Sequence, residues 1–580
     1  MGLAHPRWTV AFVAVVVFTN TLANRPVLDD GWVIFDNSLI KSLGNIPRIF
    51  HEPYNVAMTG ANAGLYRPVT MLTYALNYAL GGSNVVGYHL VNIALHVFSS
   101  LALLGLACVL LASSRAALLA ALLFAVHPAH VEAVTAMVGR AELLAALGSL
   151  TCLYLTCTRH RARWRFPAAL IALALGVLSK ENAAVTPLLW ALLAIALPAA
   201  AGLEARPGFS SADRRRALWR ASALGAAMAC ATAAYFMLRP GAGPVGASQW
   251  FHGQPRSVIF NTMSRAVAEY LRLLVLPHPL GVDFYYSNKI PFTQSFTAAS
   301  LAATAVWIAV LGLGVFLLRR APVFACGILW VFVALLPVLN IVPIGVLMAE
   351  RLLYLPSVGF CIAAGAGVAL VVERARTPPR WAPALMAVVL LALAAKTWTR
   401  NTDWHDALTL WEAELRNEPQ DVVVNNNLAV EYIARGELTK ARERLEIALR
   451  THPGYWRAHV NLGIVEHKLH DDAAAVRSLE QAHRLDPSAA SPDFFMAQVL
   501  ADQGDLSRAI DYLARAESVE PLDASTPLFR GWYLFRLGRL DEATAELSRA
   551  AALDPGNPEA RTYLAEIARS KSGVASGSAH

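Results

Sequence analysis

Residues 86–111, VGYHLVNIALHVFSSLALLGLACVLL, contain no Asp, Glu, Lys or Arg. A helix of about 20 apolar residues crosses the hydrocarbon core of a bilayer, so this stretch is long enough to span it. The whole chain has the same character, because 56% of its 580 residues are hydrophobic, 16% are charged, and the mean hydropathy is +0.44. These values exclude an ordinary soluble multidomain protein and predict an all-α, polytopic membrane protein.

Apolar stretches before and after this one bring the predicted number of spans to about eleven. They lie at residues 8–23, 86–111, 116–138, 143–157, 167–178, 183–200, 218–238, 298–318, 323–342, 352–372 and 381–395. The first run also has features of a cleavable signal peptide, but we favour an uncleaved span. Residues 24–84 then form an external loop.

The distribution of Arg residues sets the predicted topology. With a cytoplasmic N-terminus, the Arg-rich stretches at 159–165, 214–220, 319–320 and 374–380 all fall inside, as the positive-inside rule requires. This holds only if residues 257–276 do not cross. That segment carries Arg265, Glu269 and Arg272 on one helical face, which favours an interfacial or re-entrant helix.

The C-terminal region is an internal repeat. Its period is 34 residues, the tetratricopeptide (TPR) period, and it is marked by Pro419, Pro453, Pro487, Pro521 and Pro555. Two sets of alanines share the frame and predict close helix contacts: Ala441, Ala475, Ala509 and Ala543, then Ala448, Ala482, Ala516 and Ala550. The turn positions hold Gly436, Gly504 and Gly538, with His470 as the exception.

We therefore predict a membrane domain at residues 1–398 and an external TPR solenoid at 399–570. The array has a half repeat, four full repeats and a capping helix near 558–568, and a disordered tail follows at 571–580. The excess of 49 Lys and Arg over 41 Asp and Glu flanks the apolar runs, and no nucleic-acid-binding signature accompanies it. The six cysteines form no CxxC pair, so we expect no disulfide framework and no zinc site.

Adjacent carboxylates, Asp29 and Asp30, open the first external loop. A carboxylate at this level can act as general base on an incoming hydroxyl while the electrophile stays anchored in lipid. The competing interpretation is a solvated loop start or a helix cap, and spacing alone favours it.

Further charged and histidine side chains lie next to or within apolar runs, all toward the external ends of the predicted spans. They are His127, His130, Glu132, Arg140, Glu142, Lys180, Glu181, Glu350 and Arg351. An ionisable group in mid-membrane costs about 2.5 to 3.5 kcal/mol, so such groups pair with one another or serve a site. Each pair is also consistent with a structural ion pair between helices. For the two histidines we predict no metal site, because no third ligand is evident.

At these residues the chain resembles a known family, the transmembrane and tetratricopeptide-repeat O-mannosyltransferases of the GT-C glycosyltransferase class. The matching stretches are the Asp29-Asp30 loop, YRPVTMLTYALNY from Tyr66, YHLVNIALH from Tyr88, FAVHPAHVEAVTAMVGRAELLAAL from Phe124, SKEN from Ser179 and AERLLYLPSVGF from Ala349, followed by the repeats. They occur in order over nearly the whole chain.

The resemblance implies a multi-helix GT-C domain that takes a sugar from a polyprenyl or dolichyl phosphate carrier and passes it to an acceptor on the external face. It also implies an acidic general base in the first external loop, which we place on Asp29 with Asp30 as the alternative. From charge and sidedness we add Arg140, Lys180 and Arg351 as partners of the donor phosphate. We predict no other cofactor, and the sequence leaves a metal requirement open.

The array is short, and the abundance of Ala and Arg suggests a bacterial relative in the inner membrane rather than the endoplasmic reticulum. A different kind of function also fits the array, because stacked repeats form a concave surface that binds peptides. Asn427 and Asn461, one period apart, are candidates for holding an acceptor peptide, although Asn is common at this repeat position. The alternative protein would be a membrane-anchored scaffold without catalysis. A transporter would show paired inverted repeats, which are not apparent.

Overall fold

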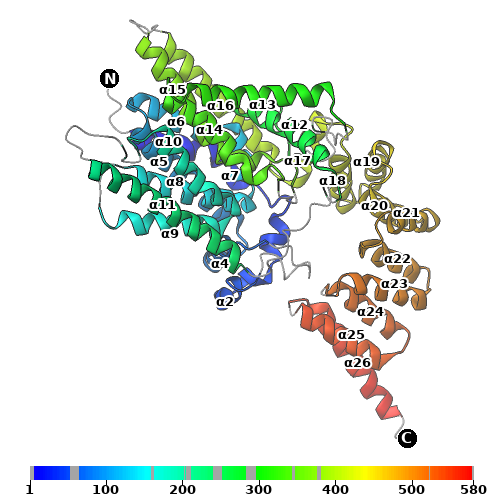
Figure 1. Cartoon of the computed structure of the whole chain (residues 1–580). Coiled ribbons are helices and arrows are strands. Elements are labelled where there is room, and N and C mark those ends of the chain that lie inside the picture. The colour runs from blue at the N-terminus through cyan, green and yellow to red at the C-terminus, as the bar shows by residue number, and fades with distance from the viewer. Residues whose placement is uncertain are drawn as a thin grey trace. The chain divides into compact units, whose positions relative to one another are not determined.

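The structure is a computed structural model that describes residues 6–52, 65–158, 162–200, 203, 211–239, 251, 253–282, 290, 295–341, 346–374, 381–521, 523–554 and 556–577. All regular elements within these ranges are helices. The chain divides after Leu410 into two compact units, which we describe separately (Figure 1).

The first unit has a helix at each of the eleven positions predicted to span. They are α1 (Pro6–Phe18), α5 (Val85–Leu110), α6 (Ser114–Val126), α8 (Arg140–Cys157), α9 (Arg165–Ser179), α10 (Thr186–Ala196), α11 (Ser211–Leu238), α13 (Ala298–Leu317), α14 (Pro322–Leu335), α15 (Pro356–Arg374) and α16 (Ala382–Asp403). Six of them, with their flanking turns, are long and apolar enough to cross a membrane, and a bent pair gives a seventh. The other four are shorter apolar helices, so length alone leaves the number of spans between six and eleven.

The bent pair is α6 and the short helical turns that follow it, which differ in direction by 52°. Pro128 explains the break, since proline lacks an amide hydrogen and disfavours helical geometry at the residue before it. His127 is accordingly extended, at φ −72° and ψ 125°. The break turns the residues after Pro128 away from the axis of α6 and toward the charged residues described below.

Helix α12 (Arg256–Val275) is the segment predicted not to cross, and it is not among the helices that meet the length and hydropathy requirements for a span. Its Arg272 pairs with Glu269 at 2.6 Å. Its buried face, which includes Tyr270 and Leu273, packs against apolar residues near Leu353. Its position relative to the membrane stays a prediction.

The ends of these helices gather into two groups. One group, which we call the cavity end, places Arg7, Ala112, Thr158, Ala200 and Pro322 around a single cavity. The other group, which we call the charged end, is defined by hydrogen bonds and ion pairs among the residues predicted to lie outside. α1, α5 and α8 each run from one end to the other, as the predicted alternation of spans requires.

One side chain and one backbone hydrogen bond tie the end of the unit to the region of its first helix at the charged end. Asn401 Nδ2 donates to Val17 O at 2.9 Å and to Asn20 Oδ1 at 2.8 Å. Arg25 N donates to His405 O at 2.8 Å. The chain therefore leaves the first unit beside the start of the first loop.

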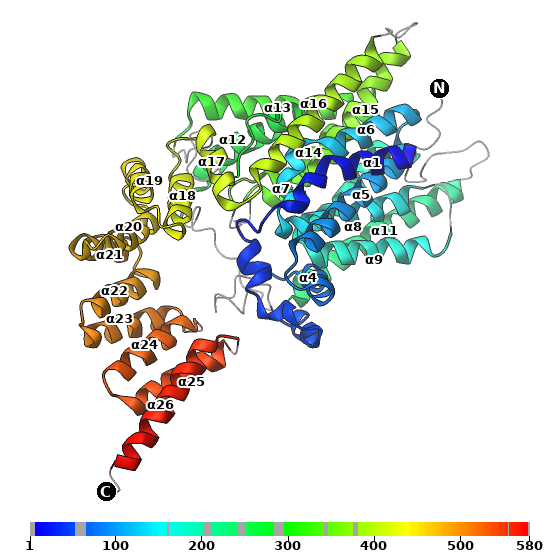
Figure 2. The same ribbon diagram turned by 180° about the vertical axis from the view of Figure 1, so that it is seen from behind.

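The second unit is a stack of helix pairs (Figure 2). Its helices are α18 (Val422–Ala434), α19 (Leu438–Thr451), α20 (Trp456–Lys468), α21 (Asp472–Leu485), α22 (Ser491–Asp502), α23 (Leu506–Val519), α24 (Ser525–Arg536), α25 (Leu540–Leu553) and α26 (Pro558–Gly577), and α17 (Ala407–Asn417) precedes them. The eight repeat alanines predicted to mark helix contacts are all buried.

The turns within the helix pairs have left-handed backbone, and the last helix is longer than predicted. Gly436, Gly504 and Gly538 have φ of 75°, 90° and 75°, and His470 adopts the same left-handed conformation at φ 63°. Helix α26 continues to Gly577, past residue 571 where the predicted tail begins, and disorder of this tail stays a prediction. The Nζ of Lys571 donates to Asp541 Oδ1 at 2.8 Å, which holds this helix on α25. Residues 578–580 lie outside the described part of the chain.

Candidate functional site

Three of the ion pairs at the charged end of the first unit lie close together. Each joins one cation to one glutamate: Arg67 to Glu181 at 2.6 Å, Lys180 to Glu142 at 2.5 Å, and Arg351 to Glu132. The pairs form one network, because Lys180 also interacts electrostatically with Arg67, Arg351 and Glu181. We call these six residues the ion-pair cluster.

Breaks between helices bring the cluster together. Arg67 precedes α4 (Pro68–Gly81), and Lys180 lies in an extended conformation where α9 ends. Arg351 lies in a short 3-10 turn before α15, and its own amide also donates to Glu132 Oε2 at 2.8 Å. Polar side chains can meet here because the backbone leaves the apolar helices at these points.

Burial and the neighbouring carboxylates act in opposite directions on the charge of these cations. Burial opposes the charge of Arg351, but Glu132, Asp29 and Glu142 hold its pKa above the usual range. Burial lowers the pKa of Lys180, and Glu142 counteracts this shift. A phosphate arriving at the cluster would therefore meet positive charges that are already oriented.

Asp29 is the member of the carboxylate doublet that faces outward. It is exposed, and its Oδ1 accepts a hydrogen bond from Trp32 Nε1 at 3.1 Å. Leu28, just before it, has φ 50°, a left-handed conformation that bulky residues avoid. Strain of this kind persists only where the surroundings impose it and is common at functional sites. Asp29 also interacts with Arg351, which places the carboxylate beside the ion-pair cluster.

Asp30 is fully buried and has a different environment. Its Oδ1 accepts from Val138 N at 2.8 Å, and its Oδ2 accepts from Val27 N at 3.2 Å. Burial raises the pKa of Asp30 to about 7, while these backbone hydrogen bonds counteract the shift. The contacts fasten the first loop to the residues before α8, so Asp30 positions its neighbour and has no open face for a substrate.

Arg140 does not fit the phosphate role predicted for it. It is fully buried, and its guanidinium donates to Asn92 Oδ1 at 3.0 Å, Tyr88 O at 3.0 Å and Thr73 O at 3.2 Å. The group also lies 4.7 Å from the ring centre of Tyr74. Because all three of its nitrogens already donate and an aromatic ring lies against it, Arg140 joins α4, α5 and α8 as a structural element.

The two histidines and Glu350, predicted as supporting residues, also hold helices together. His127 accepts from Ala129 N at Nδ1, so its Nε2 donates to Leu274 O at 3.0 Å. His130 Nε2 is 2.8 Å from Ser357 Oγ, within a cluster of aromatic rings. Glu350 Oε1 accepts from Gly281 N at 2.5 Å. Among the described residues, no group of three His, Cys, Asp or Glu side chains is arranged to hold a metal ion.

Sequence reasoning missed three residues of the site. Arg67 is the second residue of the stretch quoted from Tyr66, and an Arg directly before a helix-starting proline beside an apolar run was the available signal. Asn182, in the SKEN stretch, donates to Glu142 Oε2 at 2.9 Å. Trp32, the partner of Asp29, gave no signal, since tryptophan is common at membrane surfaces.

The predicted peptide-binding asparagines of the array belong to a short hydrogen-bonded chain. Asn461 Nδ2 donates to Asn426 Oδ1 at 2.9 Å, and Asn426 Nδ2 donates to Asn427 Oδ1 at 3.1 Å. Asn427 and Asn461 remain half-buried. The chain links consecutive repeats, and binding of a peptide by these side chains stays a prediction.

Two known protein families match this chain, one within the first compact unit and the other within the second. The family model of the dolichyl-phosphate-mannose-protein mannosyltransferases matches residues 66–205, and that of the tetratricopeptide repeat matches residues 426–490 and 495–571. The first match includes Arg67, Glu132, Glu142, Lys180 and Glu181 of the ion-pair cluster. Asp29 and Arg351 lie outside it.

Individual relatives extend over more of the chain. Protein O-mannosyl-transferase F38B6.6 of Caenorhabditis elegans is 26% identical over 77% of this chain and 61% of its own length. Protein O-mannosyl-transferase TMTC3 of Mus musculus is 26% identical over 82% of this chain and 54% of its own length. This chain therefore spans less than two thirds of either relative. Among solved structures, a thermophilic TPR protein of Thermus thermophilus covers 32% of this chain at 23% identity, with a TM-score of 0.26.

Proposed function

We propose that this chain, a relative of the protein O-mannosyl-transferases, is a membrane glycosyltransferase that moves a sugar, mannose by resemblance, from a polyprenyl-phosphate carrier to a protein hydroxyl. The observation that carries the proposal is the position of Asp29, an exposed carboxylate that interacts with Arg351 of the ion-pair cluster, where each cation is held by a glutamate. A base and a phosphate-binding group next to each other are the two parts that this reaction needs.

In the proposed reaction, Asp29 accepts the proton of the acceptor hydroxyl. The hydroxyl oxygen forms a bond to the anomeric carbon of the sugar while the bond from that carbon to the phosphate oxygen breaks. The electron pair of the broken bond leaves with the polyprenyl phosphate. Arg351 and Lys180, with Arg67 in place of Arg140, would stabilise this negative charge.

Arg351 is the strongest candidate for direct phosphate contact. Its side chain is 24% exposed, compared with 12% for Arg67 and 10% for Lys180. Arginine also presents two parallel donors to a phosphate, which lysine does not. The glutamates would hold the cations in place in the absence of donor.

We place the reaction on the external or lumenal face, with the array on the same side as an acceptor-docking surface. The positive-inside pattern supports an external position for the charged end. The hydrogen bond from Arg25 N to His405 O supports placing the array on the same membrane side as the reaction, because it shows that the chain leaves α16 at the charged end. Acceptor contact through Asn427 and Asn461 belongs to this proposal, as does a bacterial inner-membrane location.

The test is sugar transfer from polyprenyl-phosphate mannose to a mixture of acceptor peptides, measured with the purified full chain in lipid nanodiscs. Asp29→Asn should lower the rate by at least about 100-fold, the smaller contribution expected of a general base. Asp36→Asn is the matched control, because Asp36 is an exposed carboxylate of the same loop and should leave the rate unchanged.

Unchanged transfer by the Asp29→Asn protein would refute the assigned base. Wild-type protein that binds peptides but transfers no sugar from any polyprenyl-phosphate donor would favour the scaffold alternative.

A further inference from the structure

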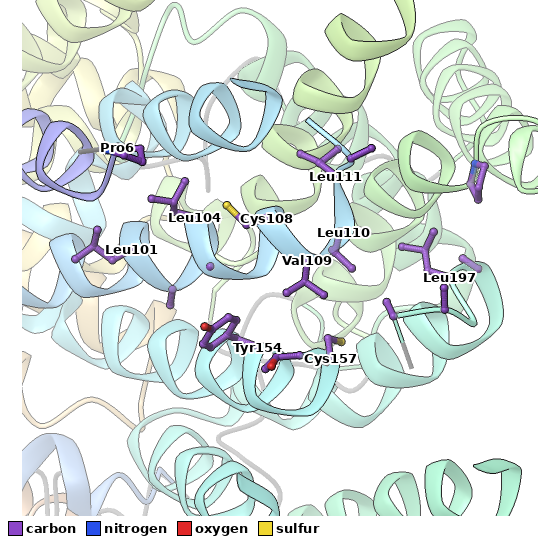
Figure 3. A pocket seen from close by; sticks show the side chains of 18 of the residues that line it. Pro6, Leu101, Leu104, Cys108, Val109, Leu110, Leu111, Tyr154, Cys157 and Leu197 are labelled. Atoms are coloured by element: carbon purple, nitrogen blue, oxygen red, sulfur yellow. The ribbon is translucent and has the colours of Figure 1, made fainter. Parts of the chain in front are cut away.

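A large cavity lies at the cavity end of the first unit, away from the proposed reaction site. It has a volume of about 1400 Å³ and is bounded by the ends of α1, α5, α8, α10 and α14 (Figure 3). Most of its lining is aliphatic, including Leu101, Leu104, Val109 and Leu197. The function proposed above makes no use of this space.

The depth of the cavity matches one leaflet of a bilayer. It is lined along α5 from Leu111, just past the helix end, back to Leu101, a rise of about 15 Å at 1.5 Å per residue. The hydrocarbon core of a bilayer is about 30 Å thick, so one leaflet contributes about 15 Å. An acyl chain entering at the helix ends would therefore run beside the apolar side chains of α5 for about the thickness of one leaflet.

Two polar side chains of the cavity lining lie near helix ends, and one of them, Arg7, is basic. Arg7 interacts electrostatically with Cys108. Thr158 also lines it, and its hydroxyl accepts a hydrogen bond from Arg165. Tyr154 lies against Gly105, where a Cβ would come within 3.0 Å of its ring, so the space between α5 and α8 depends on that glycine.

We propose that this cavity binds an anionic phospholipid, with one acyl chain between α1, α5 and α8 and the phosphate at Arg7. Charge complementarity selects this occupant, because basic pockets between membrane helices on the cytoplasmic side hold anionic head groups. The predicted topology places this end on the cytoplasmic side.

The sugar donor is a poorer match for the cavity. Its phosphate would have to reach the ion-pair cluster, and Glu142 and Tyr154 are twelve residues apart on α8, or about 18 Å along the helix. A phosphate at Arg7 is thus too far from Lys180 and Arg351 to react there. The cavity and the reaction site are two separate lipid-phosphate sites.

The test is native mass spectrometry of the purified full chain titrated with phosphatidylglycerol, phosphatidylcholine or polyprenyl phosphate. The wild-type protein should retain phosphatidylglycerol in preference to the other two. Arg7→Gln should weaken its binding about fivefold, the factor that corresponds to about 1 kcal/mol per basic residue near anionic lipid. Arg115→Gln, an exposed arginine at the start of α6 that does not line the cavity, is the matched control and should bind as the wild type does.

A second measurement keeps the proposal testable without altering the lining. In a Cys230→Ser background Cys108 is the single exposed thiol among the six cysteines, and phosphatidylglycerol should slow its reaction with a maleimide. Equal retention of phosphatidylcholine, preference for polyprenyl phosphate, or labelling of Cys108 that no lipid slows would each overturn the proposal.

Discussion

The buried carboxyl of Asp30 should make the stability of this protein fall as the pH rises from about 4 to about 7. In the unfolded chain the group has an ordinary pKa of 3.8, whereas burial raises it to about 7 in the folded protein. Below pH 4 both states hold the proton, and above pH 7 neither does. Between these values only the folded state holds it, so the free energy of unfolding decreases by about 1.4 kcal/mol per pH unit, or about 4 kcal/mol in all.

Asp30→Asn removes the titration and should flatten this part of the profile. At low pH the variant should be less stable by about 1 to 3 kcal/mol, because the amide NH₂ faces a backbone N–H where a carboxyl oxygen accepted a hydrogen bond. The difference between the two proteins should therefore shrink, and then change sign, as the pH rises. Asp36→Asn, with an exposed carboxyl in the same loop, should keep the wild-type profile.

The measurement is unfolding by denaturant in detergent micelles at half-unit intervals from pH 4 to pH 8, followed by tryptophan fluorescence. The difference between wild type and variant cancels the other titrating groups. A difference that stays constant across this range would refute the reasoning, because it would mean that the folded state already holds Asp30 ionised at pH 4.

Two further predictions concern the backbone and the helix junction. His470→Gly should stabilise the array by about 1 kcal/mol, since glycine adopts the left-handed conformation without a steric penalty. Thermal unfolding followed by circular dichroism measures this gain. An equal gain from His470→Ala would contradict the prediction. Asn401→Leu should lower the free energy of unfolding by about 3 kcal/mol, because it leaves the carbonyl of Val17 and the side chain of Asn20 without their donor. The same denaturant assay measures this, and a loss below about 1 kcal/mol would argue against a buried contact between α16 and the end of α1.

The repeat array was the most predictable part of the chain. A fixed 34-residue period places the same contact in every repeat, so position alone identified the buried alanines and the turn positions. The left-handed backbone of these turns, His470 included, is a finding of the structure. The end of the array was less predictable, because composition near Lys571 does not reveal its contact with Asp541 on the neighbouring helix.

The membrane unit could be predicted as a set of helices. The predicted alternation of their directions also placed their charged residues at one end of the unit. Roles within that end could not be predicted. Asp29 and Asp30 are chemically identical, and only tertiary contacts bury one of them. Arg140 and Lys180 are both cations beside apolar helices, yet backbone carbonyls and an asparagine occupy the first and a glutamate pairs with the second. Arg67 was missed because its partner Glu181 is 114 residues away.

The hydrogen bonds from Asn401 to the end of α1 join residues 384 and 381 positions apart in the sequence. A ribosome adds about 5 to 20 residues per second, so α1 is made roughly 20 to 75 seconds before its partner helix exists. During that interval Asn20 and Asn24 lack their partners on the last helix of the unit. The loop that carries Asp29 is therefore completed late in synthesis, and a chain that terminates before α16 would make every helix around the ion-pair cluster without closing the site.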